Sequence, residues 1–227
     1  MPWRWTADWG VRRFGFHGLS HAYIARRARE LLGPQGSRRL VSCHLGAGAS
    51  VTAILEGRSI DTSMGFTPME GLVMATRSGS IDPGLLLWLQ RSQGLAADEL
   101  ERALDRESGL LGVSGVSPDM REVLAAAAAG DERARLAVDV YVHRLRATIG
   151  AMTAALGGLD ALAFTGGVGE HSAEIRERTC AGLGHLGLGG NVEVLVIEAR
   201  EDLEIAAEVR RVVGGDGIEP PTSSMSS

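Results

Sequence analysis

Apolar residues recur along the chain with two different spacings, which together predict both helices and strands. Between Ser20 and Gly33-Pro34 they recur every third or fourth residue; Ser20 can cap a helix there, and the glycine and proline can end it. The same spacing over residues 131–156 predicts a long, largely buried helix that crosses one face of a sheet. Its apolar positions are Leu136, Val140, Val142, Leu145, Ile149 and Met152.

Short apolar runs of strand length alternate with the helical segments. They predict strands over residues 39–43, 50–55, 58–64, 161–165 and 192–197. The turn Glu56-Gly57 joins the second and third of these as a hairpin, and the last two are expected to be buried. Cap and glycine signals predict further helices over residues 83–94, 119–129 and 173–183. We therefore predict an α/β fold, with a mixed sheet and helices on both of its faces.

Length and composition narrow the class of protein. A chain of 227 residues suits one substantial domain, expected over residues 1–213, and the serine-rich end, 214–227, is predicted to be a disordered tail. The net charge of −5 argues against nucleic-acid or membrane partners, which usually require a basic patch. All 23 basic residues are arginine, which excludes a P-loop because that loop needs a lysine. Without a signal peptide, Cys43 and Cys180 are expected to be reduced thiols in a cytoplasmic protein.

Two glycine segments are the best candidates for chemistry. After the first predicted strand the chain reads His44-Leu45-Gly46-Ala47-Gly48, where small residues let the backbone turn sharply and bring its N–H groups close to an anion. Such a loop suits a phosphate group. The second segment, 167–170, lies between a predicted strand and a helix, so a helix N-terminus can face the same ligand. Taken alone, it is more simply an ordinary strand-to-helix turn.

Six motifs are distinguished by their order and spacing. They are RRFGFHGLSH at 12–21, CHLGAGAS at 43–50, DTSMGFTPMEGLVMATRSGSIDPG at 61–84, SPDMRE at 117–122, FTGGVGEHS at 164–172 and VIEAREDLEIA at 196–206. Together they make the chain similar to the C-terminal half of the acetokinase family, in the actin-like ATPase superfold, over about residues 2–213. The resemblance implies a ribonuclease-H-like domain.

The resemblance also implies an activity, namely transfer of the γ-phosphoryl group of ATP to acetate, with Mg²⁺, to give acetyl phosphate and ADP. Propionate kinase shares the motifs, whereas butyrate kinase fits residues 61–79 less well. The family pattern implies an N-terminal domain, needed for activity, that supplies the substrate-binding arginine, the catalytic aspartate, and an asparagine and a lysine. A homodimer is expected, because in the family this half carries the dimer contact. The alternative is a truncated, non-catalytic fragment that at most binds nucleotide or pairs with a kinase subunit.

Residue by residue, the resemblance implies two catalytic side chains and one metal ligand. Arg77 matches an arginine that stabilises the transferring phosphoryl group, and His17 matches a histidine that contacts the same group. Glu201 occupies the place of a glutamate associated with Mg²⁺, which prefers oxygen ligands. The residues implied to hold the nucleotide are His44, Leu45, Gly46, Ala47, Gly48, Asp119, Met120, Arg121, Gly167, Val168, Gly169, Glu170 and His171.

Several of these positions also have a structural interpretation. Asp119 is more simply the first turn of a helix, and Glu201 is otherwise a solvated surface acid. Packing or helix-surface positions are expected for His21, His143 and His185, and packing for Trp3, Trp5 and Trp9. Three residues depart from the family pattern. Ala47 stands in place of asparagine, Ser80 in place of aspartate, and His171 in place of asparagine. Each departure is expected to weaken nucleotide binding while it preserves the loop geometry.

Overall fold

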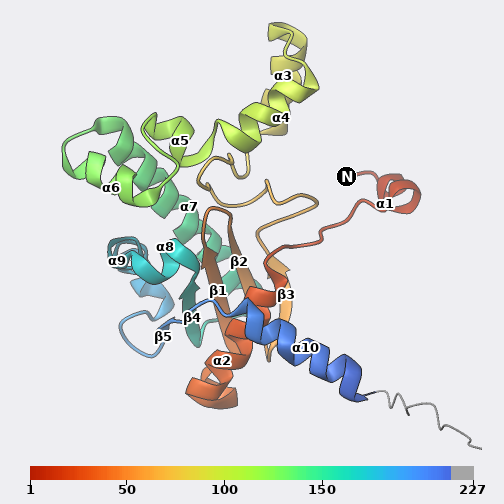
Figure 1. Cartoon of the computed structure of the whole chain (residues 1–227), viewed down its shortest axis with the longest axis vertical. Coiled ribbons are helices and arrows are strands. Elements are labelled where there is room, and N and C mark those ends of the chain that lie inside the picture. The colour runs from red at the N-terminus through yellow and green to blue at the C-terminus, as the bar shows by residue number, and fades with distance from the viewer. Residues whose placement is uncertain (216–227) are drawn as a thin grey trace, which may run out of the picture.

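The sheet at the centre of the fold is mixed, as predicted (Figure 1). Within residues 1–215, which the computed structural model describes apart from the side chains of residues 211, 212, 214 and 215, five strands pair in the order β3-β2-β1-β4-β5. β2 is antiparallel to β1 and β3, whereas β1, β4 and β5 are parallel. The strands are β1 (Arg39–Leu45), β2 (Ala49–Leu55), β3 (Arg58–Thr62), β4 (Ala161–Thr165) and β5 (Glu193–Val196).

Helices form close to the predicted ranges, but the predicted Ser20 cap is wrong, because that helix begins at Gly18 and Ser20 lies inside it with its Oγ hydrogen-bonded to His44 Nδ1. Asp82, Asp119 and Asp131 each cap the helix that follows, because the carboxylate accepts a hydrogen bond from a backbone N–H of its first turn. The helices are α1 (Trp3–Trp9), α2 (Gly18–Gly36), α3 (Pro83–Gln93), α4 (Ala97–Arg106), α5 (Gly109–Ser114), α6 (Met120–Ala128), α7 (Glu132–Leu156), α8 (Gly166–His171), α9 (Ala173–Ala181) and α10 (Glu201–Gly215), with a 3₁₀ turn over Gly184–Leu186. The predicted tail beyond α10 lies outside the described residues, and the domain boundary at 213 stays a prediction.

Helices cover both faces of the sheet, which confirms that prediction. On one face α7 packs across β1 and β2, where Leu145 and Ile149 are fully buried in the larger apolar core. On the other face α2 packs on β1 and β4 through Ile24, and α10 lies against α2 (Figure 1). Arg26 and the buried Glu204 join these two helices by a salt bridge of 2.9 Å. The sheet is therefore fixed from both sides, and its loops are left to form the site.

Two predictions of burial are wrong in part. Along β5, Val194 and Val196 are 41% and 49% exposed, because β5 is the last strand of the sheet and pairs with β4 alone among the described residues. On α7, Leu136 is 53% exposed, since the buried face of that turn runs through Ala137 and Val138 instead. Of the other predicted apolar positions, Val142, Leu145, Ile149 and Met152 are buried and Val140 is partly buried, so the correction concerns the start of the helix.

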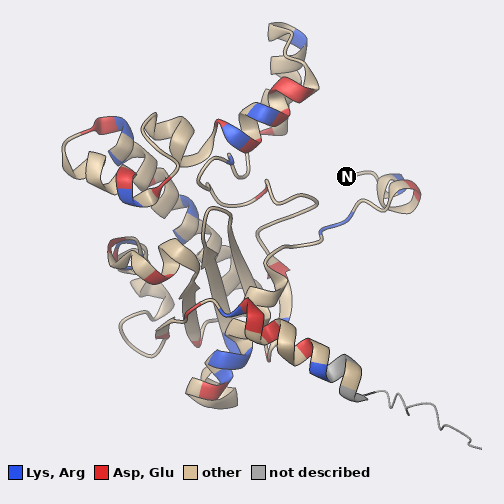
Figure 2. Ribbon diagram, viewed as in Figure 1, with Lys and Arg blue, Asp and Glu red and all other residues tan. Residues whose placement is uncertain are grey.

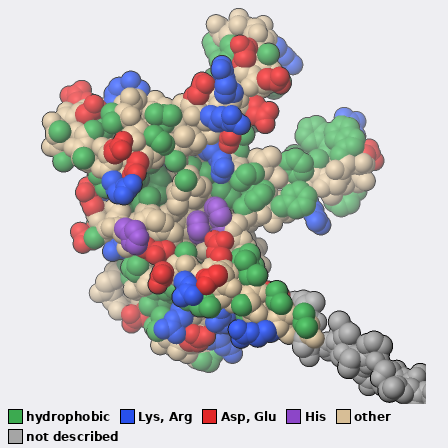
Figure 3. All heavy atoms as spheres, viewed as in Figure 1, with side chains coloured by type: hydrophobic (Ala, Val, Ile, Leu, Met, Phe, Trp, Pro, Cys, Tyr) green, Lys and Arg blue, Asp and Glu red, His purple; other side chains and the backbone are tan. Residues whose placement is uncertain are grey.

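The tryptophan-rich N-terminal segment does not have its predicted packing role. α1 projects from the body of the protein, and none of its residues is buried (Figure 1). Trp3 and Trp9 are 80% and 70% exposed, and Trp9 stacks only on Trp5, with ring centroids 6.2 Å apart. Hydrophobic atoms accordingly cover much of this projection in Figure 3. Exposed apolar patches of this kind mark interaction surfaces.

The state of the two cysteines can be checked directly against the structure. Cys43 and Cys180 are both free, as expected, and burial raises the pKa of each thiol. Cys43 is fully buried beneath the sheet surface and is therefore inert. Among the described residues, no helix is long and apolar enough to cross a membrane.

Candidate active site

The two glycine segments lie at the same edge of the sheet. β1 and β4 are parallel neighbours, with His44 paired to Thr165, so the segments that follow them leave the sheet side by side. Gly46 and Gly167 line a single cavity of about 720 Å³ between the β1–β2 hairpin, α6 and α8. The expectation that both segments face one open side is thereby confirmed. The cavity is lined by Gly46, Ala47, Ala75, Leu110, Pro118, Asp119, Met120, Arg121, Leu124, Tyr141, Gly167, Val168, His171 and Ser172.

The residues expected to hold nucleotide divide into those that line this cavity and those that support it. Gly46, Ala47, Asp119, Met120, Arg121, Gly167, Val168 and His171 line it. Leu45 and Gly169 are buried beneath the loops, where α8 packs on β1. α8 begins at Gly166, directly after β4. The predicted turn over 167–170 is therefore the first turn of a helix itself.

Glu170 holds two segments together instead of lining the cavity. Its Oε1 accepts hydrogen bonds from the backbone N–H of Gly166 at 2.8 Å and of Ala199 at 3.0 Å. Ala199 lies just before α10, whose first residue is Glu201. The carboxylate thus fixes the start of α8 against the segment that leads to the predicted metal ligand. The structure gives Glu170 a positioning role at this site.

Asp119 and Arg121 form a charged pair on the cavity wall at the start of α6. Asp119 accepts a hydrogen bond of 2.9 Å from the backbone N–H of Arg121, and its carboxylate also binds the Arg121 guanidinium. The side-chain hydrogen bond from Arg121 lowers the pKa of Asp119 to about 2, so the aspartate is ionised at neutral pH. Leu110, Met120 and Leu124 make the neighbouring wall apolar. An apolar pocket with a few polar groups at its edge is typical of sites for small organic ligands.

His17 and His44 lie together beside the glycine loop. His17 precedes α2 with a left-handed backbone, φ 57°, which is uncommon outside glycine. The two rings stack with centroids 4.1 Å apart; His17 Nδ1 is 2.9 Å from Ser50 Oγ, and His44 Nδ1 is 2.8 Å from Ser20 Oγ. Burial, with a further effect of His44, lowers the pKa of His17 to about 4, and burial lowers the pKa of His44. Both rings are therefore neutral at pH 7, and each can donate one N–H.

Arg77 reaches the same place from the loop after β3. Its Nε donates to Asp105 at 2.9 Å and its Nη1 to the carbonyl oxygen of Pro68 at 3.3 Å, which fix the guanidinium. A Cβ placed on Gly48 would lie 3.3 Å from Arg77 Nη1 and 3.4 Å from His17 Nε2. Glycine at this position leaves a small space open with both groups at its wall. The structure therefore brings together the two predicted catalytic residues, which are far apart in the sequence.

The loop that carries Arg77 is closed by hydrogen bonds between Gly71 and Ser80. Ser80 N donates to the carbonyl oxygen of Gly71 at 3.0 Å, and Ser80 Oγ accepts a hydrogen bond of 3.0 Å from Gly71 N. At Gly79, φ is +72° and a Cβ would lie 2.4 Å from the carbonyl oxygen of Leu72, so only glycine fits. Serine in place of the family aspartate thus still supplies an acceptor that closes this turn. His171 and Ala47, the other two departures, both line the cavity.

His21 belongs to the site, although the sequence suggested only a packing role for it. It follows His17 by one turn of α2, is 5% exposed, and lies 2.9 Å from Ser42 Oγ through Nδ1 and 2.8 Å from Ser50 Oγ through Nε2. Burial lowers its pKa to about 3. The sequence carried no clear signal for this contact, because His17 lies before α2 with a left-handed backbone and Ser42 and Ser50 belong to two different strands. His143 and His185 have no part in this cluster.

Glu201, the predicted metal ligand, is exposed at the start of α10. The first turn of α10 is rich in acidic residues (Figure 2), and the charge of Glu201 partly opposes the lowering of the His17 pKa. Within residues 1–215, no group of three or more His, Cys, Asp or Glu side chains can enclose a metal ion. Mg²⁺ does not require one, since it is usually held by one or two carboxylates, water and substrate phosphates. One exposed carboxylate fits an ion that arrives with the nucleotide.

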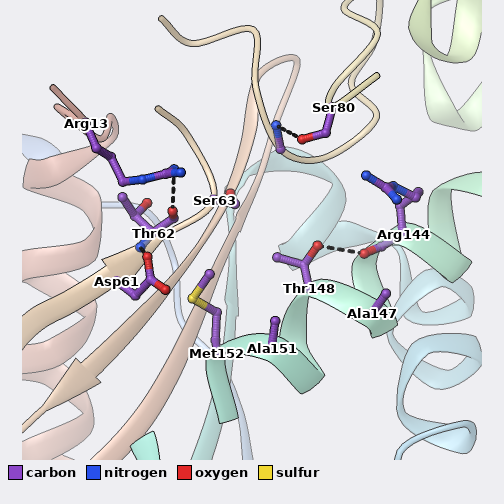
Figure 4. A pocket seen from close by; sticks show the side chains of 11 residues that line it. Arg13, Asp61, Thr62, Ser63, Ser80, Arg144, Ala147, Thr148, Ala151 and Met152 are labelled. Carbon is purple, nitrogen blue, oxygen red and sulfur yellow. Dashed lines mark hydrogen bonds between the residues drawn. The ribbon is translucent and has the colours of Figure 1, made fainter. Parts of the chain in front are cut away.

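A second cavity of about 280 Å³ lies between β3 and α7 (Figure 4). Arg13 and Thr62 line one side of it, and Arg144 and Thr148, which belong to α7, line the other. Arg13 Nη1 donates to the carbonyl oxygens of Thr62 and Met64, each at 3.0 Å, and so ties the segment before α2 to the end of β3. None of the predicted catalytic or nucleotide residues lines this cavity. It is separate from the site described above.

The mixed sheet, with glycine loops at the carboxyl ends of two parallel strands, defines the chain as a domain of the actin-like ATPase class. The acetokinase family model matches residues 1–210, and the chain belongs to the acetokinase family. It is 52% identical over 225 residues to the acetate kinase of Nostoc punctiforme, which covers 90% of this chain and 55% of the relative. It is 48% identical to the propionate kinase of Citrobacter rodentium, with 93% and 57% covered. The chain thus spans about half the length of the curated relatives it matches.

Solved structures of this family have the same fold. The acetate kinase of Porphyromonas gingivalis superposes with a TM-score of 0.89 at 40% identity, covering 93% of this chain and 58% of that one. A propionate kinase from Francisella tularensis gives a TM-score of 0.86 at 38% identity, with 92% and 58% covered. The similarity is therefore to one part of a longer fold, and it does not separate acetate kinases from propionate kinases.

Proposed function

We propose that the chain is the nucleotide-binding part of an acetate kinase, which transfers the γ-phosphoryl group of ATP to acetate and releases acetyl phosphate and ADP. The observation that carries the proposal is the convergence of Arg77 and His17 at Gly48, beside a cavity flanked by two glycine loops. Positive charge and hydrogen-bond donors at the transferring group are the main requirement of phosphoryl-transfer catalysis. This wall of the site supplies both.

Each part of the wall has a distinct task in the proposed reaction. The apolar end of the cavity holds the nucleoside, and the backbone N–H groups of the loops at Gly46 and Gly167 hold its phosphates. The Arg77 guanidinium, fixed by Asp105, binds equatorial oxygens of the phosphoryl group as it passes in line to the acceptor. His17, neutral at pH 7, donates its Nε2 proton to the same group.

Mg²⁺ is the cofactor that this chemistry implies. When bound with the nucleotide it would neutralise charge on the phosphate oxygens. Of the residues in this chain, Glu201 is the one proposed to hold it, because its exposed carboxylate begins α10 next to the histidines. His44 and the loops remain available for the phosphates themselves.

The remaining proposals concern partners and location. Acetate is proposed as the acceptor and propionate as the alternative, since relatives of both names have similar identity to this chain. We propose that the acceptor is held by the half of the longer relatives that the chain does not match. A homodimer in the cytoplasm, without nucleic-acid or membrane partners, is also proposed. The exposed apolar residues of α1 give such a dimer a surface to bury.

The proposed function is tested by mixing the chain with the N-terminal half of a family relative and trapping acetyl phosphate with hydroxylamine. We expect turnover by the mixture but not by the chain alone, because orienting the acceptor is worth roughly 7 kcal/mol or more in good cases. Arg77→Ala should lower kcat by about 10³-fold, with a smaller effect on nucleotide binding. Arg106→Ala is the matched control, since Arg106 also pairs with Asp105 but is 79% exposed.

The other candidate function is a non-catalytic fragment that binds nucleotide. The large cavity favours nucleotide binding in either case, so binding alone does not separate the two. A mixture that binds ATP but never forms acetyl phosphate would establish the non-catalytic alternative. Full activity of the Arg77→Ala mixture would overturn the role given to Arg77.

A further inference from the structure

We infer that His21 and Ser50 act as positioning residues that fix the tautomer of His17, so that the proton of the His17 ring always lies on Nε2 and faces the phosphoryl group. The inference rests on the proposed function and deepens it, because it assigns a role to two residues that do not touch the nucleotide. Its basis is an unbroken line of hydrogen bonds from the core of the sheet to the site.

The line has four members and three hydrogen bonds. Ser42 Oγ lies 2.9 Å from His21 Nδ1, His21 Nε2 lies 2.8 Å from Ser50 Oγ, and Ser50 Oγ lies 2.9 Å from His17 Nδ1. Ser42 and Ser50 are fully buried and His21 is 5% exposed, so water does not compete for these groups. The last atom of the line, His17 Nε2, is one of the two groups at the Gly48 space.

A count of protons leaves two possible directions for the line. Ser50 has a single hydroxyl proton between two ring nitrogens. If it accepted from both rings, that proton would be left buried without an acceptor among the described residues, so it donates to one ring and accepts from the other. In the first direction Ser42 donates to His21, His21 donates to Ser50, and Ser50 donates to His17 Nδ1, which leaves the proton of His17 on Nε2. In the second direction every bond is reversed, and His17 presents a lone pair to the site.

The buried end of the line selects the first direction. Within the described residues, the Ser42 hydroxyl has a hydrogen bond to His21 alone. In the second direction this hydroxyl would accept from His21, and its own proton would be left buried without an acceptor, which is costly. In the first direction every proton of the line is used. The buried Ser42 hydroxyl thus makes His17 Nε2, the nitrogen that faces the phosphoryl group, a hydrogen-bond donor and not an acceptor.

His44 is held in the same way, which supports the inference independently. Its Nδ1 lies 2.8 Å from Ser20 Oγ, and its Nε2 lies near Gly46, where a Cβ would be 3.5 Å from it. In both histidines, therefore, a serine holds Nδ1 and the other nitrogen lies at a loop glycine. A neutral imidazole donates at only one nitrogen, so a Ser20 hydroxyl that donates to Nδ1 leaves the proton of His44 on Nε2.

The test is the direct detection of the ring protons by nitrogen-15 NMR on the histidine-labelled full chain, with His17→Gln and His44→Gln used only to assign signals. We expect the Nε2–H tautomer for His17 and for His44. Ser50→Ala should give a mixture of tautomers at His17 and leave His44 unchanged. Thr52→Val is the matched control, because it removes a buried hydroxyl two residues along β2 that bonds to Thr62 instead.

Two NMR results would overturn the inference. One is the Nδ1–H tautomer at His17 in the unaltered chain, and the other is an unmixed Nε2–H tautomer at His17 in Ser50→Ala. The first needs no substitution, so the test stands even if Ser50→Ala fails to fold. In the mixture with a family N-terminal half, Ser50→Ala should lower kcat about 10-fold or more with little change in KM for ATP, and full activity there would also count against it. Because the NMR readout does not need turnover, it separates this inference from the proposed function, which the Arg77→Ala assay tests.

Discussion

The histidine-lined edge of the sheet and the projecting helices α1 and α3 are built in opposite ways. At the edge, Ser42, Ser50 and His21 are buried, and each has a hydrogen-bond partner at a fixed position. In α1 and α3 no residue is buried, and Trp3 and Trp88 are 80% and 52% exposed. The difference shows that packing is concentrated where a few polar atoms are held at fixed positions, whereas the projecting helices bury none of their residues.

The largest expected effect is a loss of stability at one of two glycines that share a backbone angle, φ +72°: Gly79 lies in the Arg77 loop beside the site, and Gly94 lies at the end of α3. Gly79→Ala should lower the free energy of unfolding by about 3 kcal/mol or more, because the new Cβ would lie 2.4 Å from the carbonyl oxygen of Leu72. Gly94→Ala, at the end of α3, has nothing within 4 Å and should cost only about 1 kcal/mol. Urea unfolding of both variants measures the difference. Equal losses would show that the Arg77 loop is no more tightly packed than α3.

The second effect depends on pH and is confined to the histidine-lined edge. His21 has its pKa lowered from 6.5 to about 3, so its contribution to stability is complete above pH 6.5 and is lost as the pH falls toward 3, where the unfolded chain takes up a proton that the folded chain excludes. Between pH 7 and pH 5 this should lower the free energy of unfolding by about 2 kcal/mol. Urea unfolding of His21→Gln at both pH values should show a smaller loss than the unaltered chain. An identical loss would contradict the assignment.

The third effect concerns a buried polar group that lacks a hydrogen-bond partner among the described residues. In the described part of the chain, the Tyr141 hydroxyl is the buried side-chain group that lacks a hydrogen-bond partner, and Tyr141 also lines the large cavity. Tyr141→Phe should therefore raise the free energy of unfolding by about 1 kcal/mol, since an unsatisfied buried group costs that order of energy. Thermal unfolding without nucleotide measures it. A loss of stability would show that the hydroxyl is satisfied in solution.

The smallest effect on folding is expected in α1. Replacing Trp3 and Trp9 together by serine should change the free energy of unfolding by less than about 0.5 kcal/mol, because both side chains are exposed. The same double variant should lower the sedimentation coefficient if α1 forms the proposed dimer contact. A large loss of stability at a concentration where the chain is monomeric would show that α1 packs on the body of the protein.

The sequence predicted the strands, the main helices and the shared edge of the two glycine segments, because these depend on local spacing and on the parallel pairing of β1 and β4. It failed where the outcome depends on partners distant in the chain. The role of Glu170 as a link to Ala199 and the exposure of Val196 on an edge strand are set by tertiary contacts. So is the bridge from Ser42 through His21 to Ser50, which joins a helix to two strands.

The link made by Glu170 has a consequence for the divergence of such proteins. Its carboxylate binds the backbone at Gly166 and at Ala199, so the motif over 164–172 and the motif over 196–206 share one anchor. Neither segment can change its path without changing the other. In chimaeras between relatives, the two segments should therefore be inherited as a pair, because an exchange of one without the other would disturb the hydrogen bonds that Glu170 makes to both.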